Sequence, residues 1–374
     1  MRIFSIFYLL ICLCLSTFAG KPVDVLLCAY DTGDSNIMKR LLPEITKNNM
    51  TYAITAFGRG VDIFKDEKML HILKSGSLEN RGQLLSETDI RSVQKEFEPK
   101  IVLAGMASAG QAQVLNAFPK SQQVAIYDNF DPPEGKEFIQ PFVKTVGPIH
   151  LYMVCAVFLV APFQDLFKGT PVEAVGQPAL EEWRDVFEST DRTKLRKDLG
   201  LEMNQKVIVF AGGTDDTYKK NLDIFVRTVA RHPHWKVFVT YHPKTDGSVE
   251  RAAVKDANAR NIKVSNDIKT NSLATIADVL VCHKSSVCQQ AFSVGVSCVY
   301  VAGKEYHNFL TDQKLVIRVE TEDQLEKYLT QKMLGQPKLW ATRLKENQEI
   351  MTAAGIPSQA SEGIVSRLKR LMEA

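Results

Sequence analysis

Short apolar runs alternate with helix-like stretches along most of this chain. The first half contains the runs KPVDVLLCAY, TYAITAFG, KIVLAGMAS and QVAIYDNFDPP. Each run ends in small, acidic or turn-forming residues, and the stretches between them have the apolar periodicity of helices. Strands that alternate with helices usually pair in parallel, with helices on both faces of the sheet. The first half therefore predicts a doubly wound parallel sheet.

The same alternation begins again after residue 205. The expected strands are KVIVFAGG, KVFVTYHPK, IKVSN, LATIADVLVCHKSS and SCVYVAG, with the helices TYKKNLDIFVRTVARH and VCQQAFSVGV among them. A chain of 374 residues is also longer than one hydrophobic core usually serves. The expected fold class is therefore α/β, with two Rossmann-like domains and an interdomain cleft.

The domain boundaries follow from the polar stretch in the middle of the chain. We expect an N-terminal domain at 21–174, a linker at 175–205 and a C-terminal domain at 206–350, followed by a helix at 351–374 that could cross back onto the first domain. Within the first domain, helices are expected at about 36–47, 62–73 and 87–97. The apolar run LYMVCAVFLV is too short for a membrane span and fits a buried helix or strand.

Residues 1–20 have the pattern of a signal peptide. Met1 and Arg2 precede the apolar run IFSIFYLLICLCLSTFA, and Thr17 and Ala19 are small residues before a possible cleavage at Gly20. We therefore expect an exported protein, in the periplasm, the extracellular space or a secretory pathway. An uncleaved segment would instead anchor the chain to a membrane.

Charge and cysteine usage exclude some classes of function. The formal net charge is only +3, which argues against a nucleic acid partner and leaves an anionic small molecule open. The five cysteines beyond the signal peptide show no CxxC spacing. They predict neither a disulfide framework nor a metal site and are typical of small buried residues, although one disulfide among Cys282, Cys288 and Cys298 stays open.

Ligands of open parallel sheets bind beyond the carboxyl ends of the strands. After KVIVFA come Gly212, Gly213 and Thr214. Glycines let the backbone approach a phosphate closely, and a hydroxyl can cap the next helix. A plain turn between strand and helix explains the same residues equally well.

Two further strand ends carry groups suited to a phosphate. His242 and Lys244 follow KVFVTY on either side of a proline, and Ser285 and Ser286 precede the helix VCQQAFSVGV. An imidazole, an ammonium and two hydroxyls at a helix start can bind an anion. The simpler interpretations are a surface His-Pro turn and an ordinary serine cap.

The paired HPK and SS elements, about 40 residues apart, resemble the His-Pro and Ser-Ser motifs of bacterial GT-B glycosyltransferases. These include sialyl- and polysialyltransferases and CDP-glycerol glycerophosphotransferases. The resemblance covers about residues 192–329 and implies that His242, Ser285 and Ser286 contact the nucleotide and phosphate of an activated donor, with Lys244 nearby. The Asp-Glu-Gly element of the sialyltransferases is not evident in this sequence.

Acidic loops of the first half could supply a general base. Asp31 and Asp34 follow the first strand, and Asp128 and Asp131 follow a later one. An inverting glycosyltransferase needs a carboxylate or imidazole that takes the proton of the acceptor hydroxyl. We favour Asp128 for this role, because the segment before it resembles the first domain of some GT-B proteins. Turn-forming and helix-capping aspartates are the alternative.

The sequence thus predicts transfer of a nucleotide-activated sugar or alcohol phosphate to an acceptor hydroxyl. The activated donor is a substrate, and neither a separate cofactor nor a metal is expected. A sugar-nucleotide epimerase of the same fold is one alternative. An exported solute-binding protein or a catalytically inactive GT-B domain is another, since nucleotide-activated donors are made in the cytoplasm.

Overall fold

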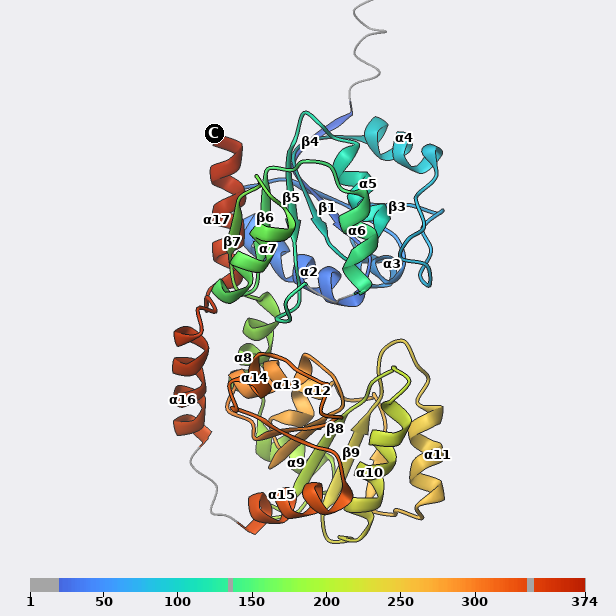
Figure 1. The fold of residues 1–374 in the computed structure, drawn as a ribbon, viewed down its shortest axis with the longest axis vertical. Coiled ribbons are helices and arrows are strands. Elements are labelled where there is room, and N and C mark those ends of the chain that lie inside the picture. Colours follow the sequence, from blue (N-terminus) through green and yellow to red (C-terminus); the bar gives the residue numbers. More distant parts are fainter. Residues whose placement is uncertain (1–19, 134–136, 335–339, 374) are drawn as a thin grey trace, which may run out of the picture. The chain divides into compact units, whose positions relative to one another are not determined.

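The structure, a computed structural model, describes residues 20–133, 137–334 and 340–373. They form two compact units (Figure 1). Unit 1 comprises the chain up to Ala179 together with Ala354 onward, and unit 2 comprises Leu180–Ala353. The chain therefore connects the two units twice. The expected signal peptide lies outside the described residues except for Gly20.

Unit 1 contains one parallel sheet in the order β3-β2-β1-β4-β5-β6-β7. Its strands are β1 (Lys21–Ala29), β2 (Tyr52–Ala56), β3 (Leu70–Ile72), β4 (Phe97–Gly105), β5 (Gln122–Ile126), β6 (Leu151–Val154) and β7 (Val172–Ala174). Its helices are α2 (Thr32–Lys47), α3 (Arg59–Phe64), α4 (Glu87–Glu96), α5 (Ala109–Asn116), α6 (Gln140–Thr145), α7 (Val160–Leu166) and α17 (Ala360–Glu373), with 3₁₀ turns η1 (Glu137–Ile139) and η2 (Val157–Leu159).

The hydrophobic core of unit 1 contains residues of the first strand, β1, and of the last helix, α17. Alternate strand residues such as Val25, Leu27 and Ile101 pack against the apolar side of α2. The last helix, α17, covers the same face of the sheet with Ile364 and Leu368, both fully buried (Figure 1). The returning tail is thus part of the first core.

Unit 2 repeats the architecture with the strand order β10-β9-β8-β11-β12-β13. Its strands are β8 (Val207–Ala211), β9 (Lys236–Thr240), β10 (Ile262–Val264), β11 (Val279–Cys282), β12 (Cys298–Val301) and β13 (Ile317–Val319). Its helices are α8 (Pro178–Ser189, which begins at the end of unit 1), α9 (Arg192–Asp198), α10 (Tyr218–Ala230), α11 (Ser248–Asp256), α12 (Thr270–Ala274), α13 (Val287–Ser293), α14 (Phe309–Asp312), α15 (Glu322–Leu334) and α16 (Trp340–Ala353).

One face of this second sheet buries valines and Phe210 against α10 and α15, through residues such as Phe225 and Leu329. On the other side, α13 packs on β11 and β12. Two parallel sheets, each covered by helices, confirm the predicted α/β class with two Rossmann-like halves. The expected linker at 175–205 contains α8 and α9.

Several local predictions were wrong. The helix expected at about 36–47 begins at Thr32, because Asp31 caps it by accepting the N–H of Thr32. The helix expected at 62–73 ends at Phe64, and Leu70–Ile72 forms an edge strand paired with β2. The predicted strand LATIADVLVC is a strand only over Val279–Cys282, and α12 occupies its beginning. Short elements such as these have too few residues to show a period.

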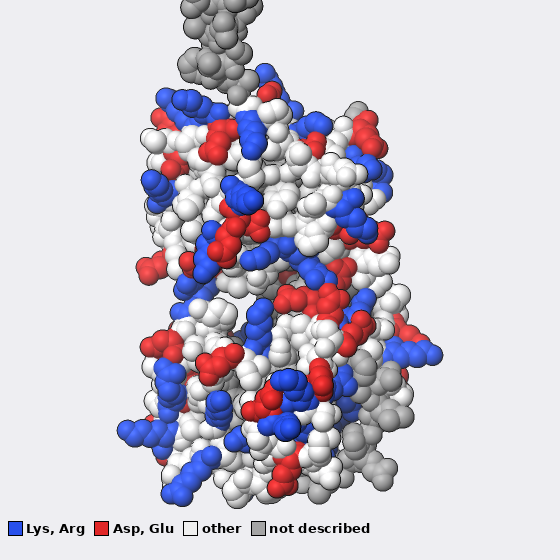
Figure 2. All heavy atoms as spheres, turned by 180° about the vertical axis from the view of Figure 1, so that it is seen from behind, with Lys and Arg blue, Asp and Glu red and all other residues white. Residues whose placement is uncertain are grey.

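The cysteines are the small buried residues that the sequence predicts. All five cysteines of the described residues, namely Cys28, Cys155, Cys282, Cys288 and Cys298, are buried and free. On the face seen in Figure 2, lysines and arginines are interspersed with acidic residues over both units. Among the described residues, no helix has the length and apolar content needed to span a bilayer.

Candidate functional site

The carboxyl ends of the parallel strands of unit 2 meet at one edge of the sheet. Strand β8 lies between β9 and β11. The strands β9 and β10 extend the sheet on one side of β8, and the later strands β11, β12 and β13 extend it on the other side, so the strand order reverses at β8. Such a switch point is where open α/β sheets bind ligands. The loops after β8, β9 and β11 carry all the residues that the sequence predicted for the donor.

The loop after β8 can reach its neighbours because it contains two glycines. The Gly212 N–H donates to the Thr240 carbonyl at 2.8 Å. A Cβ at Gly212 would lie 2.8 Å from the same oxygen, and one at Gly213 would lie 2.7 Å from Cδ2 of His283. The glycines therefore bring together the loops after β8, β9 and β11. Thr214 is exposed and does not cap α10, which begins only at Tyr218.

The turn after β9 orients His242. Its Nδ1 accepts the backbone N–H of Lys244 at 3.1 Å, and its carbonyl accepts the backbone N–H and the hydroxyl of Thr245, each at 2.9 Å. An imidazole that accepts at Nδ1 carries its proton at Nε2 when neutral. His242 thus presents an N–H donor, and in this turn Lys244 contributes its backbone.

The two serines after β11 differ in their environment. Ser285 Oγ accepts the N–H of Val287 at 3.2 Å, and this acceptor role leaves the O–H of Ser285 as a donor. Ser286 occupies the N-cap position of α13 in an α conformation, and its side chain makes no capping hydrogen bond. It is exposed. Both hydroxyls can therefore donate an O–H to an anion, and the predicted contact of Ser285 and Ser286 with a donor phosphate stays a prediction.

A hydrogen-bonded network around His283 completes this edge. His283 is 1% exposed, accepts from Asn221 Nδ2 at Nδ1 (3.0 Å) and contacts Asp215 Oδ1 through Nε2 (2.9 Å). Lys284 lies 3.1 Å from Asp215 Oδ2 and 3.0 Å from the hydroxyl of Thr217. Partial burial acts to raise the pKa of Asp215, but the hydrogen bonds from Thr217, Lys284 and His283 outweigh it and lower that pKa.

Sequence reasoning had not assigned functional roles to Asp215, His283 and Lys284. The available signal was their position, since Asp215 follows the glycine pair and His283 and Lys284 precede the two serines. Among the described residues, no group of three or more His, Cys, Asp or Glu side chains is arranged to hold a metal ion.

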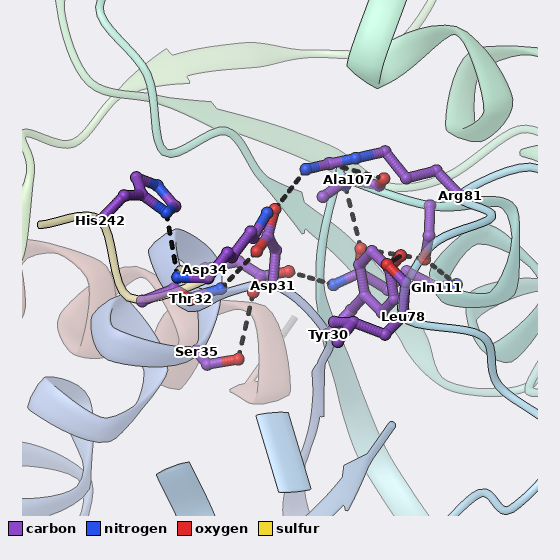
Figure 3. A network of polar contacts seen from close by, with 12 residues as sticks. Tyr30, Asp31, Thr32, Asp34, Ser35, Leu78, Arg81, Ala107, Gln111 and His242 are labelled. Carbon is purple, nitrogen blue, oxygen red and sulfur yellow. Dashed lines mark hydrogen bonds and ion pairs between the residues drawn. The ribbon is translucent and has the colours of Figure 1, made fainter. Parts of the chain in front are cut away.

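The corresponding edge of unit 1 gathers acidic side chains. Figure 3 shows Asp31 paired with Arg81, which also donates to the Ala107 carbonyl at 3.2 Å. In the same view, Asp34 accepts hydrogen bonds from Gln111 Nε2 and from the Ser35 hydroxyl. The start of α2 thus holds Asp31, its N-cap residue, in an ion pair and Asp34 in hydrogen bonds to neutral side chains.

Asp128 joins this group from the end of β5. A Cβ at Gly33 would overlap the Asp128 carboxylate, and a Cβ at Gly105 would overlap that of Asp34. Burial raises the pKa of Asp34 to about 7, with the charge of Asp128 as the second cause. The structure therefore brings Asp31, Asp34 and Asp128 together. Asp131 lies in the following turn, where its N–H donates to Asn129 Oδ1 at 3.0 Å.

Comparison with known proteins gives a likeness at the level of the fold. No family model and no curated protein matches the chain. Among solved structures, UDP-GlcNAc 2-epimerase from Neisseria meningitidis, bound to UDP-GlcNAc, is similar with a TM-score of 0.65 and 14% identity over 94% of this chain and 100% of that chain. The S. aureus MnaA–UDP complex has a TM-score of 0.67 and 10% identity over 94% and 97%.

The wall teichoic acid polymerase TagF is also similar, with a TM-score of 0.60 and 14% identity over 95% of this chain and 90% of that chain. The chain has a GT-B glycosyltransferase-like fold. In open α/β sheets, ligands bind outside the carboxyl ends of the strands. The candidate site residues of both units lie in loops at these strand ends.

Proposed function

We propose that this GT-B-like protein transfers a sugar or an alcohol phosphate from a nucleotide-activated donor to an acceptor hydroxyl. One observation carries the proposal. The loops with the His-Pro-Lys and Ser-Ser elements and the glycine loop after β8 are packed against one another at the switch point of unit 2, through Gly212, Gly213 and His283. Three motifs distant in the sequence thus form one surface of polar groups.

Unit 2 would bind the donor. The backbone of Gly212 and Gly213, with Thr214 beside them, allows close approach of a phosphate. His242 offers the N–H of Nε2, Ser286 offers an exposed hydroxyl and Lys244 brings positive charge. Ser285 supports the turn that presents Ser286. Hydrogen bonds from such groups stabilise the negative charge of a departing nucleotide.

Unit 1 would act on the acceptor. The acceptor oxygen attacks the donor, the bond from the transferred group to the nucleotide breaks with its electron pair leaving on the nucleotide, and Asp128 takes the hydroxyl proton. The raised pKa of Asp34 keeps that carboxyl largely protonated below pH 7. We therefore assign the role of the base to Asp128 and not to Asp34.

A specific observation also favours a second reaction, epimerisation of a sugar nucleotide. An epimerase removes a proton from a carbon and returns one, which requires one group that accepts a proton and one that donates a proton. Asp34 and Asp128 both lie near residue 33 of α2, and burial raises the pKa of Asp34 to about 7. Several similar folds are UDP-GlcNAc 2-epimerases. Conversion of a sugar nucleotide without any acceptor would identify this reaction.

We further propose that the protein is exported by residues 1–20. N-terminal sequencing of the protein purified from its own cells distinguishes cleavage before Gly20 from an uncleaved anchor. A mature chain that still begins at Met1, found in the cytoplasm, would contradict export.

The decisive experiment is a thermal-shift screen against CMP, CDP, UDP, GDP and their common sugar and glycerol conjugates. A ligand at 100 times its Kd stabilises the native state by about 2.7 kcal/mol. We expect a shift with one nucleotide class that His242→Ala and Ser286→Ala reduce. Absence of a shift with every nucleotide would contradict the proposal and leave an inactive domain or an exported solute-binding protein. Binding without turnover over a panel of acceptors would favour the binding protein.

A further inference from the structure

Asp215 presents one carboxylate oxygen at the edge of unit 2. Its Oδ1 has three partners, namely Nε2 of His283, the backbone N–H of Thr217 and the hydroxyl of Thr217, at 2.9, 2.8 and 2.7 Å. Its Oδ2 contacts only Lys284 among the described residues. The side chain is 43% exposed. Since a carboxylate oxygen can accept at least two hydrogen bonds, Oδ2 retains capacity for one more.

The ammonium group of Lys284 also has one hydrogen-bond donor without an acceptor among the described residues. Its ammonium has three N–H donors, of which Asp215 Oδ2 and Thr217 Oγ1 accept two within the described residues. Its side chain is 23% exposed. The accessible side of this ion pair therefore offers one donor and one acceptor next to each other. A hydroxyl group, which donates and accepts, matches such a pair.

The network behind the pair holds it in place. Asn221 donates to Nδ1 of the buried His283, which leaves the proton on Nε2 to donate to Asp215. Gly213 lies against the same imidazole. Asp215 is thus fixed through a buried side chain and a backbone N–H, and little order has to be imposed on it when a ligand binds. The hydrogen bonds it receives keep it an acceptor across the physiological pH range.

We propose that Asp215 and Lys284 bind the hydroxyl groups of the part of the donor that is transferred, a sugar or glycerol. This inference rests on the proposed function, in which His242 and Ser286 contact the nucleotide phosphates. The carboxylate of Asp215 repels a negatively charged phosphate. It attracts a hydroxyl, because the hydroxyl can donate a hydrogen bond to it. A hydrogen bond of this charged type is worth about tenfold to a hundredfold in affinity.

The test compares the affinity for a bare nucleotide with that for its conjugate by calorimetric titration. The probes are UDP with UDP-N-acetylglucosamine and CDP with CDP-glycerol. For the pair that binds, we expect Asp215→Asn to weaken the conjugate at least tenfold and to change the bare nucleotide less than twofold. Asp216→Asn is the matched control, since Asp216 is an exposed neighbour without a hydrogen bond or ion pair among the described residues.

Lys284→Met provides a second variant that removes the other half of the pair, in case Asp215→Asn lowers the yield of folded protein. It should also weaken the conjugate more than the bare nucleotide. Equal weakening of both ligands in these variants, or of neither, would overturn the inference and leave Asp215 as a structural tie between two loops. If the wild-type protein binds neither these four probes nor any other nucleotide of the thermal-shift screen, the proposed function fails, and the inference fails with it.

Discussion

A methyl group on Gly213 would lie 2.7 Å from Cδ2 of the buried His283 imidazole. The loop after β8 and the turn after β11 can therefore pack together only because residue 213 has no side chain. Through this contact, the loop position of Asp215 depends on a histidine that is distant in the sequence.

Gly213→Ala should accordingly destabilise unit 2 by about 1–3 kcal/mol, the usual cost of overpacking a rigid site. It should also weaken nucleotide binding. Gly303→Ala is the control, because the three atoms nearest to its new methyl all belong to the end of the Glu305 side chain, which can move away. Urea unfolding followed by tryptophan fluorescence measures the effect on unit 2, since Trp183, Trp235 and Trp340 all belong to that unit. Equal stability of the two variants would contradict the packing argument.

The two nitrogen atoms of His242 can be tested separately. Asparagine places a carbonyl oxygen near the position of Nδ1 and can still accept the Lys244 N–H, whereas glutamine reaches the position of Nε2 and can donate to a ligand. We expect His242→Gln to retain part of the nucleotide affinity and His242→Asn to lose about tenfold or more, as for one charged hydrogen bond. Titration calorimetry checks the order. Better binding by the asparagine variant would show that Nε2 is not the contact.

Gly33→Ala tests the position of Asp128. The new methyl would overlap only the Asp128 carboxylate. In the wild-type background the change should destabilise unit 1, although alanine within a helix is otherwise favoured over glycine by about 1 kcal/mol. In an Asp128→Gly background the same change should therefore stabilise it. A double-mutant cycle measured by urea unfolding and far-UV circular dichroism gives the coupling. Additive effects would mean that the two residues do not meet.

Asp34 should make the stability of unit 1 depend on pH. Its native pKa, raised to about 7, exceeds the ordinary value of 3.8. The native state then binds more protons between these values, so the free energy of unfolding falls as the pH rises, by up to about 4 kcal/mol between pH 4 and pH 7. Asp34→Asn should remove this fall and be more stable than the wild type at pH 8.

Urea unfolding at pH 5 and pH 8 compares the two proteins. Asp66→Asn, at an exposed position, is the control and should keep the wild-type slope. A wild-type slope in the Asp34→Asn variant would assign the pH dependence to other groups.

The last helix should be essential to unit 1. Leu368 is fully buried in the first core, whereas its neighbour Lys369 is exposed. Leu368→Ala should destabilise unit 1 by about 2–5 kcal/mol, and Lys369→Ala should have little effect. The loss should appear in circular dichroism and leave the tryptophan transition of unit 2 in place. A shift of the tryptophan transition alone would contradict the assignment of α17 to unit 1.

The long elements of this chain could be predicted from its sequence. Buried parallel strands such as β1 and β8 are continuous apolar runs, and helices such as α10 and α17 repeat their apolar residues with a helical period. Those patterns reflect burial that each element needs wherever it packs. The fold class and the positions of the main loops followed from them. Short elements such as β3 and α12 did not, because a few residues contain no period.

The sequence by itself placed Gly212, His242 and Ser286 after the ends of three different strands, which is a local property of each segment. Only the tertiary structure decided which carboxylate is buried, as for Asp34. It also revealed the contact between Asp215 and His283, 68 residues apart. Partnership and burial depend on where distant segments meet in space, and a single segment carries no record of the side chain that it will face.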